Sequence, residues 1–102
     1  MTKRNSIRVI QYRDGNQIWH AQCLEYDIVV QAEDTGKLRT RLEVAVYGEA
    51  ALSKELNGSE FAGIDPAPKM YEDLWKTINA DDNMNSLKIG NNGIEAELRT
   101  VA

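Results

Sequence analysis

The stretch that decides the fold runs from Ile18 to Ala51 and reads IWHAQCLEYDIVVQAEDTGKLRTRLEVAVYGEAA. Its first half is rich in β-branched and aromatic residues, which favour strands, and its second half repeats leucine and alanine at helical spacing. Asp34 and Thr35 separate the two halves, and such residues commonly cap the N-terminus of a helix. The stretch therefore predicts a strand, a short link, a second strand and a long helix with Thr35 as its N-cap.

The two strands expected directly before the helix cover residues 17–24 and 28–32. In the first strand, alternation predicts a core-directed face, formed by Trp19, Ala21 and Cys23. The second strand opens with three β-branched residues in a row, which favour a central position with both faces apolar. Such a strand needs cover on both sides, and a second copy of the protein could supply one of them.

The sequence on either side predicts further elements. Residues 7–13 favour a strand, which the Asp14-Gly15-Asn16 turn joins to the next. The long helix should end near Asn57-Gly58, and Pro68 fits the first turn of a second helix over 68–79. After a polar connection, residues 87–89 and 94–101 favour two short strands around the glycine-rich turn at 90–93, with the last strand at an edge of the sheet.

These elements predict an α+β fold: a small, three- to four-stranded, largely antiparallel sheet with a β-β-β-α core and a C-terminal strand, packed with one long and one shorter helix. The core-facing residues expected on the long helix are Leu38, Leu42, Ala45, Val46, Leu52 and Leu56. Those expected on the second helix are Met70, Leu74, Trp75 and Ile78. Phe61 and Ile64 should pin the intervening loop to the body of the protein.

Size and composition narrow the class of protein. A chain of 102 residues corresponds to one domain, residues 1–102. The single Cys23 excludes an internal disulfide and a zinc-binding thiolate cluster, and it favours a cytoplasmic location. No apolar run approaches the roughly 20 residues that cross a membrane. The net charge of −4 suits a basic partner and gives no support for broad binding to nucleic acid.

Few residues suggest catalysis, and we expect no enzyme activity and no cofactor. His20 could act as a general base, but a surface position on a strand explains it as well. Cys23 could act as a nucleophile or simply be buried, as cysteines commonly are. Glu25 and Asp27 lie two apart on an extended segment and could hold metal ions in a nuclease or hydrolase.

Other residues have two interpretations each. Trp19 and Trp75 could be anchors for a partner protein or parts of the core. The basic residues Lys37, Arg39 and Arg41, early in the long helix, could contact phosphate or form an ordinary solvated face.

The order of strands and helix resembles that of the HicB antitoxin family and its stand-alone HicB-like relatives. The resemblance rests on Trp19-His20-Ala21, on Gln31-Ala32-Glu33-Asp34-Thr35 and on the leucine- and alanine-rich helix, and it covers residues 7–51. The link at 23–28 lacks the proline and glycine of the family pattern. Residues 87–102 predict a strand or hairpin in place of the family's C-terminal DNA-binding segment, so DNA binding is not expected.

The resemblance implies a partial RNase H-like fold without working catalytic carboxylates. It also implies a binding role, in which the protein masks a small, basic, RNA-cleaving toxin. The alternative is a self-associating regulatory or structural protein, and a homodimer or larger assembly is expected. The residues assigned to partner binding are Trp19, Glu25, Tyr26, Asp27, Phe61 and Ile64.

Overall fold

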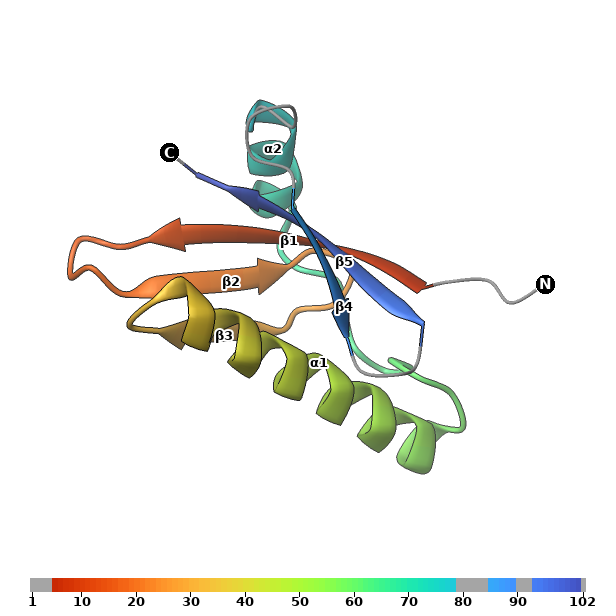
Figure 1. Cartoon of the computed structure of the whole chain (residues 1–102). Helices are drawn as coiled ribbons and strands as arrows, with labels where there is room; N and C mark the ends of the chain where they lie inside the picture. Colours follow the sequence, from red (N-terminus) through yellow and green to blue (C-terminus); the bar gives the residue numbers. More distant parts are fainter. Residues whose placement is uncertain (1–4, 79–84, 90–92, 102) are drawn as a thin grey trace.

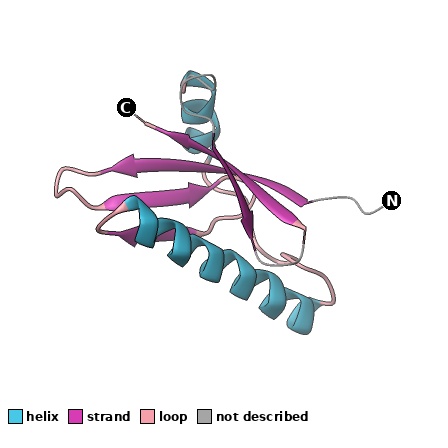
Figure 2. Cartoon of the chain, viewed as in Figure 1, coloured by secondary structure: helices cyan, strands magenta, loops and turns pink. Residues whose placement is uncertain are grey.

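The computed structural model describes residues 5–78, 85–89 and 93–101, and Figures 1 and 2 show its α+β architecture. A curled, mixed sheet has the strand order β3-β2-β1-β5-β4, and two helices pack against it. The elements in chain order are β1 (Asn5–Arg13), β2 (Trp19–Cys23), β3 (Val29–Ala32), α1 (Thr35–Asn57), α2 (Lys69–Thr77), β4 (Asn85–Ile89) and β5 (Ile94–Thr100). Neither helix is both long and apolar enough, in the part of the chain described, to cross a membrane.

The sheet differs from the expected one in size and direction. It has five strands, and β1 pairs in parallel with β5, with Val9 opposite Leu98. The remaining pairs are antiparallel, as expected for hairpin-connected strands. Along the sequence, both helices come between β3 and the last two strands. A connection of this length lets β5 run beside β1 in the same direction. Three of the four strand pairs are antiparallel, so the sheet is largely antiparallel as predicted, but the parallel β1–β5 pair and the fifth strand were not foreseen.

Two strand positions were also predicted wrongly. β3 lies at an edge of the sheet, whereas β5 lies between β1 and β4. Ile28 is buried in the link, where its carbonyl accepts a hydrogen bond from the Cys23 amide, while Val29 is exposed. The run of β-branched residues thus reflects a buried link followed by an edge strand. The predicted alternation of the last strand is confirmed, since Ile94, Ala96 and Leu98 are buried. Most of the turn predicted at 90–93 lies outside the described residues.

α1 covers one face of the sheet and has well-defined ends. Asp34, not Thr35, is the N-cap, and its Oδ1 accepts a hydrogen bond from the Lys37 amide at 2.8 Å. The helix ends where predicted, at a left-handed Gly58 whose amide donates to the Lys54 carbonyl. The geometry of the N-cap determines where α1 starts, because the carboxylate of Asp34 reaches the free amides of the first turn.

The buried side of α1 matches the prediction only in its first half. The buried helix residues are Leu38, Leu42, Val46, Ala50 and Ser53. Steps of four residues advance about 40° around a helix, so this stripe winds away from the side that carries Leu52 and Leu56. Both of these leucines are exposed, and their assignment to the core was wrong.

α2 packs on the opposite face of the sheet. Val9 and Ile10 are neighbours on β1 but belong to separate clusters, the first beneath α1 and the second with Leu24 and Trp75. Half-buried residues complete this second cluster: Tyr12, Tyr71, Leu74, Ile78 and Val101. The prediction is confirmed for Trp75, while Met70 is exposed and was wrongly assigned to the buried side.

Candidate partner-binding surfaces

The link between β2 and β3 meets the loop at 58–68 at one corner of the molecule. The rings of Tyr26 and Phe61 are stacked, with centroids 4.1 Å apart and planes 11° from parallel. The Asp27 amide donates to the Asp65 carbonyl at 2.7 Å, and the Ala67 amide donates to the Leu24 carbonyl at 3.0 Å. Loop and link are therefore held together as one rigid surface.

Five of the six residues assigned to partner binding belong to this corner, and Trp19 does not. Phe61 is buried, with a left-handed φ of 63°, and the half-buried Ile64 packs against the core. Both residues pin the loop, as predicted. Trp19 packs against the core beneath α1, beside the guanidinium of Arg13. The residues left at the surface of the corner are Glu25, Tyr26 and Asp27.

These three residues and two neighbouring acids, Glu60 and Asp65, form what we call the acidic corner. Burial raises the pKa of the Tyr26 phenol above its usual value, and the nearby Cys23, Glu25 and Glu60 add to the effect. In the described ranges, no ion pair involves Asp27, Glu60 or Asp65. Among the described residues, the corner thus presents three carboxylates that form no ion pair.

Glu25 has a different role, because it is bound within the protein. Its Oε2 accepts from Arg8 Nε at 2.6 Å, and its Oε1 accepts from the Arg8 amide at 2.6 Å. The other end of the same guanidinium binds both carboxylate oxygens of Glu72 on α2, at 2.6 and 2.9 Å. These hydrogen bonds lower the pKa of Glu72 below its usual value. Arg8 therefore joins the acidic corner to α2.

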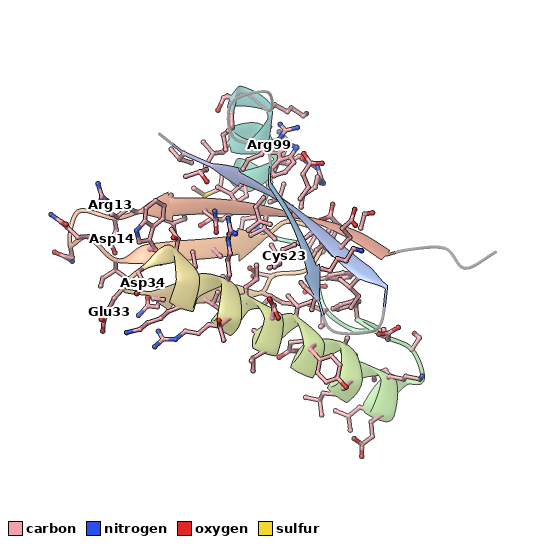
Figure 3. All side chains as sticks on the ribbon, viewed as in Figure 1. Arg13, Asp14, Cys23, Glu33, Asp34 and Arg99 are labelled. Atoms are coloured by element: carbon pink, nitrogen blue, oxygen red, sulfur yellow. The ribbon has the colours of Figure 1, made fainter. Side chains whose placement is uncertain are left out.

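The residues weighed for catalysis have structural surroundings. His20 Nε2 lies 2.7 Å from Asp14 Oδ2, and the imidazole stacks on Tyr12 at 4.9 Å. The contact with His20 lowers the pKa of Asp14, whose other oxygen accepts from the amides of Asn16 and Ile18. Asp14, seen at the end of the β1–β2 hairpin in Figure 3, thus organises the turn that the sequence predicted.

No metal site is evident in the described ranges, where no group of three or more His, Cys, Asp or Glu side chains could hold an ion. Glu25 is held by Arg8, and Asp27 Oδ1 accepts a hydrogen bond from Gln22 Nε2 at 3.0 Å. The two carboxylates considered for metal binding are thus engaged by neighbouring side chains.

Cys23 is fully buried between the sheet and α1 (Figure 3). Burial raises the pKa of its thiol to about 11. At pH 8 the thiolate fraction should be about a hundredfold smaller than in the unfolded chain, whose cysteine titrates near 8.5. We expect the native protein to react correspondingly slowly with a disulfide reagent at that pH.

Denaturant should restore fast reaction of Cys23. Because its folded pKa lies above the unfolded one, the thiol favours the folded state at pH 8 and below, and that preference is lost as the pH rises toward about 11. Equal rates for native and unfolded protein at pH 8 would contradict this assignment.

A second exposed surface lies on α1, away from the sheet. We call it the outer face of α1 and define it by Val44, Tyr47, Gly48, Ala51 and Leu52. Val44 is 68% exposed, Tyr47 49% and Leu52 50%. These positions repeat at intervals of three and four, as the buried stripe does, so the spacing was present in the sequence but was not recognised as a separate face.

Nearby basic residues are also exposed or half-buried, in keeping with a solvated helix face. Arg41 Nη1 donates to the Gln31 carbonyl at 2.7 Å, and Lys37 Nζ lies 3.7 Å from Glu33 Oε2.

Comparisons with models of known families, with curated proteins and with solved structures found no match. The acidic corner and the outer face of α1 are therefore the two surfaces from which a function can be inferred.

Proposed function

We propose that the protein is a non-enzymatic binding module that uses its acidic corner to cover a small, basic partner protein. The observation that carries the proposal is the group of Asp27, Glu60 and Asp65, which have no ion-pair partner in the described ranges and lie around the stacked Tyr26. Opposite charge speeds encounter and selects against wrong partners. The half-buried ring of Tyr26 adds apolar contact area to the patch.

The rigidity of this corner supports the same role. Backbone hydrogen bonds join the two segments, and Arg8 anchors them to α2. A surface ordered before binding loses less conformational entropy when the partner arrives. The acidic corner therefore suits direct docking better than folding on contact.

The resemblance to HicB-like antitoxins gives the proposal its finer form. The observed order of β1-β2-β3, α1 and late strands is the order on which the resemblance rests. In that form, the fold is HicB-like, or partially RNase H-like, and the partner is a toxin that cleaves RNA. The free, buried thiol of Cys23 is compatible with a cytoplasmic location.

Capture of partners from cells of the native organism tests the proposal. The full-length tagged protein should retain a small, basic protein at low salt and lose part of it at high salt, because screening weakens exposed charge pairs. Neutralising the corner with D27N and D65N together should strongly reduce recovery. The amide oxygen that D27N introduces can still accept the hydrogen bond from Gln22, so the fold should be preserved.

The matched control is the double variant E49Q and D73N, which removes the same charge from exposed helix positions. It should recover the partner as well as the wild type does. The proposal fails if no basic protein is captured, or if both double variants lose it equally. The first result would favour self-association, and the second would indicate that only net charge matters.

A further inference from the structure

We propose that the outer face of α1 binds the same face of a second copy, with the two helices antiparallel about a two-fold axis at Gly48. The apolar area is the first observation. Val44, Tyr47 and Leu52 are each about half exposed or more, and no part of the described chain covers them. Contiguous apolar surface of this kind commonly marks an interface.

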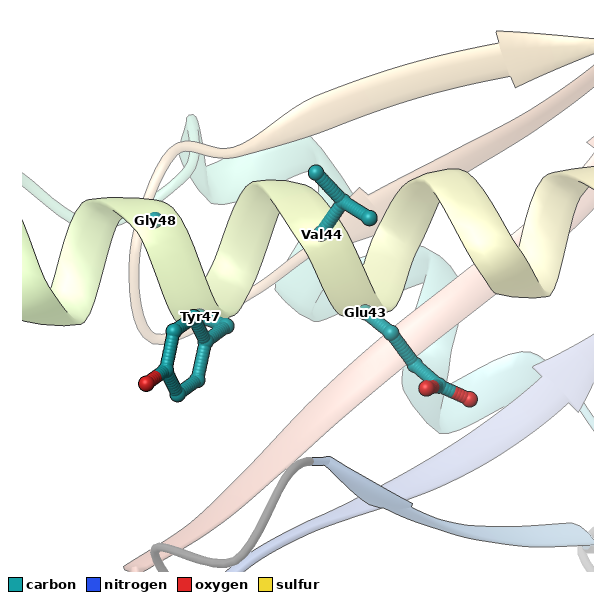
Figure 4. Close-up of a pocket in the computed structure, with 4 residues that line it drawn as sticks. All are labelled: Glu43, Val44, Tyr47 and Gly48. Atoms are coloured by element: carbon teal, nitrogen blue, oxygen red, sulfur yellow. The ribbon is translucent and has the colours of Figure 1, made fainter.

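Gly48 is the second observation, because the fold of one chain does not explain it. A glycine inside a helix is less favourable than alanine. A Cβ added at Gly48 would meet no atom of the described residues within 4 Å, so no neighbour in that part of the chain requires its absence. Figure 4 shows Gly48 beside Val44 and Tyr47, which line a shallow hollow with Glu43. A glycine at such a place allows the backbone of another helix to approach closely.

The third observation is that the face is complementary to itself. Val44 and Leu52 each lie four positions from Gly48, and Arg41 and Glu55 each lie seven positions from it. A two-fold axis at Gly48 places Val44 opposite Leu52 of the second copy and Arg41 opposite Glu55, twice over. Two-fold interfaces require such self-complementarity, since each contact occurs in both directions.

Two opposite charges of α1, Arg41 and Glu55, form no ion pair among the described residues of one chain, which favours this occupant over another. Lys37, four positions before Arg41, is already paired with Glu33. Arg41 uses one nitrogen on the Gln31 carbonyl, and its planar guanidinium carries further N–H donors. Glu55 forms no ion pair among the residues described. An antiparallel second copy brings these opposite charges together.

Sedimentation equilibrium of the full chain tests the proposal across micromolar to millimolar concentrations. We expect a concentration-dependent dimer, and G48L should raise its dissociation constant at least about tenfold. R41E and E55R should each weaken the dimer, because each places like charges opposite one another. The double variant R41E and E55R should restore it, since the pair is then reversed in both directions.

The charge reversal separates the interface from folding, because restored dimerisation cannot arise from a damaged chain. Circular dichroism of G48L should keep the helical signal of the wild type. A wild type that stays monomeric at millimolar concentration would overturn the proposal, as would a double variant weaker than both single ones. Protection of α1 from hydrogen exchange by a captured basic protein, with no dimer, would assign the face to that protein instead.

Discussion

Replacing Leu42 with alanine is expected to lower the free energy of unfolding by about 2–5 kcal/mol. Leu42 is fully buried in the first half of α1, within the cluster that joins this helix to β2 and β3. Removing its side chain loses apolar burial and leaves a cavity that the rigid sheet cannot close completely. Urea unfolding followed by circular dichroism measures the change, and the slope of the transition should remain that of the wild type.

Leu56 provides the matched control on the same helix. It is 70% exposed, so L56A should change the free energy of unfolding by no more than about 0.5 kcal/mol. Similar losses for both variants would mean that the last turn of α1 is buried, in contradiction to the packing described here.

Replacing Trp75 with alanine is expected to cost about 3–5 kcal/mol, because its ring anchors α2 to the sheet. Trp75 is buried with Ile10 and Leu24. Two guanidinium groups also lie over its ring, that of Arg99 4.0 Å and that of Arg8 5.8 Å from the centroid. Figure 3 shows Arg99 beside α2, where its Nη1 donates to the Trp75 carbonyl at 3.1 Å.

In W75A, we expect α2 to open locally more readily than the rest of the protein unfolds. Hydrogen exchange should show α2 opening in W75A, while the amides of α1 and β1 keep more of their protection. M70A, an exposed position on the same helix, should leave both exchange and stability nearly unchanged. Wild-type protection of α2 in W75A would show that other contacts hold this helix.

The local elements could be predicted from the sequence because they depend on short-range patterns. Alternation identified the buried face of β5, and Gly58 marked the end of α1. The positions of strands in the sheet could not be predicted in the same way. The run from Ile28 to Val30 has the composition of a central strand, yet pairing with β2 alone leaves Val29 exposed. Whether a strand lies at the edge or in the centre of the sheet depends on which distant strand pairs with it. The periodicity of residues along one strand carries no information about that pairing.

The same distinction between short-range patterns and long-range contacts applies to the candidate site. The loop residues Phe61 and Ile64 could be placed against the body because large apolar side chains in a loop need burial. The ion pair of Glu25 with Arg8 could not be predicted, since the two residues lie 17 positions apart. Glu72, which binds the same arginine, lies 64 positions from Arg8. Long-range charge pairs of this kind leave no repeating pattern in the chain.

The outer face of α1 was missed for a different reason. Two stripes on one helix share the same spacing of three and four residues, and a search for the stripe that faces the core accounts for only one of them. Leu52 was placed on the wrong stripe, and Val44 and Tyr47 on neither. A helix that is apolar on two sides therefore indicates a second contact, which the sequence alone does not distinguish from the core.

The affinity of the purified basic partner for this protein, measured at low and at high salt, tests the central claim most directly. We expect D27N and D65N together to weaken binding and to flatten its salt dependence, while E49Q and D73N leave both unchanged, because the proposal places the partner on the acidic corner. Equal affinity for wild type and D27N/D65N at both salt concentrations would contradict the account.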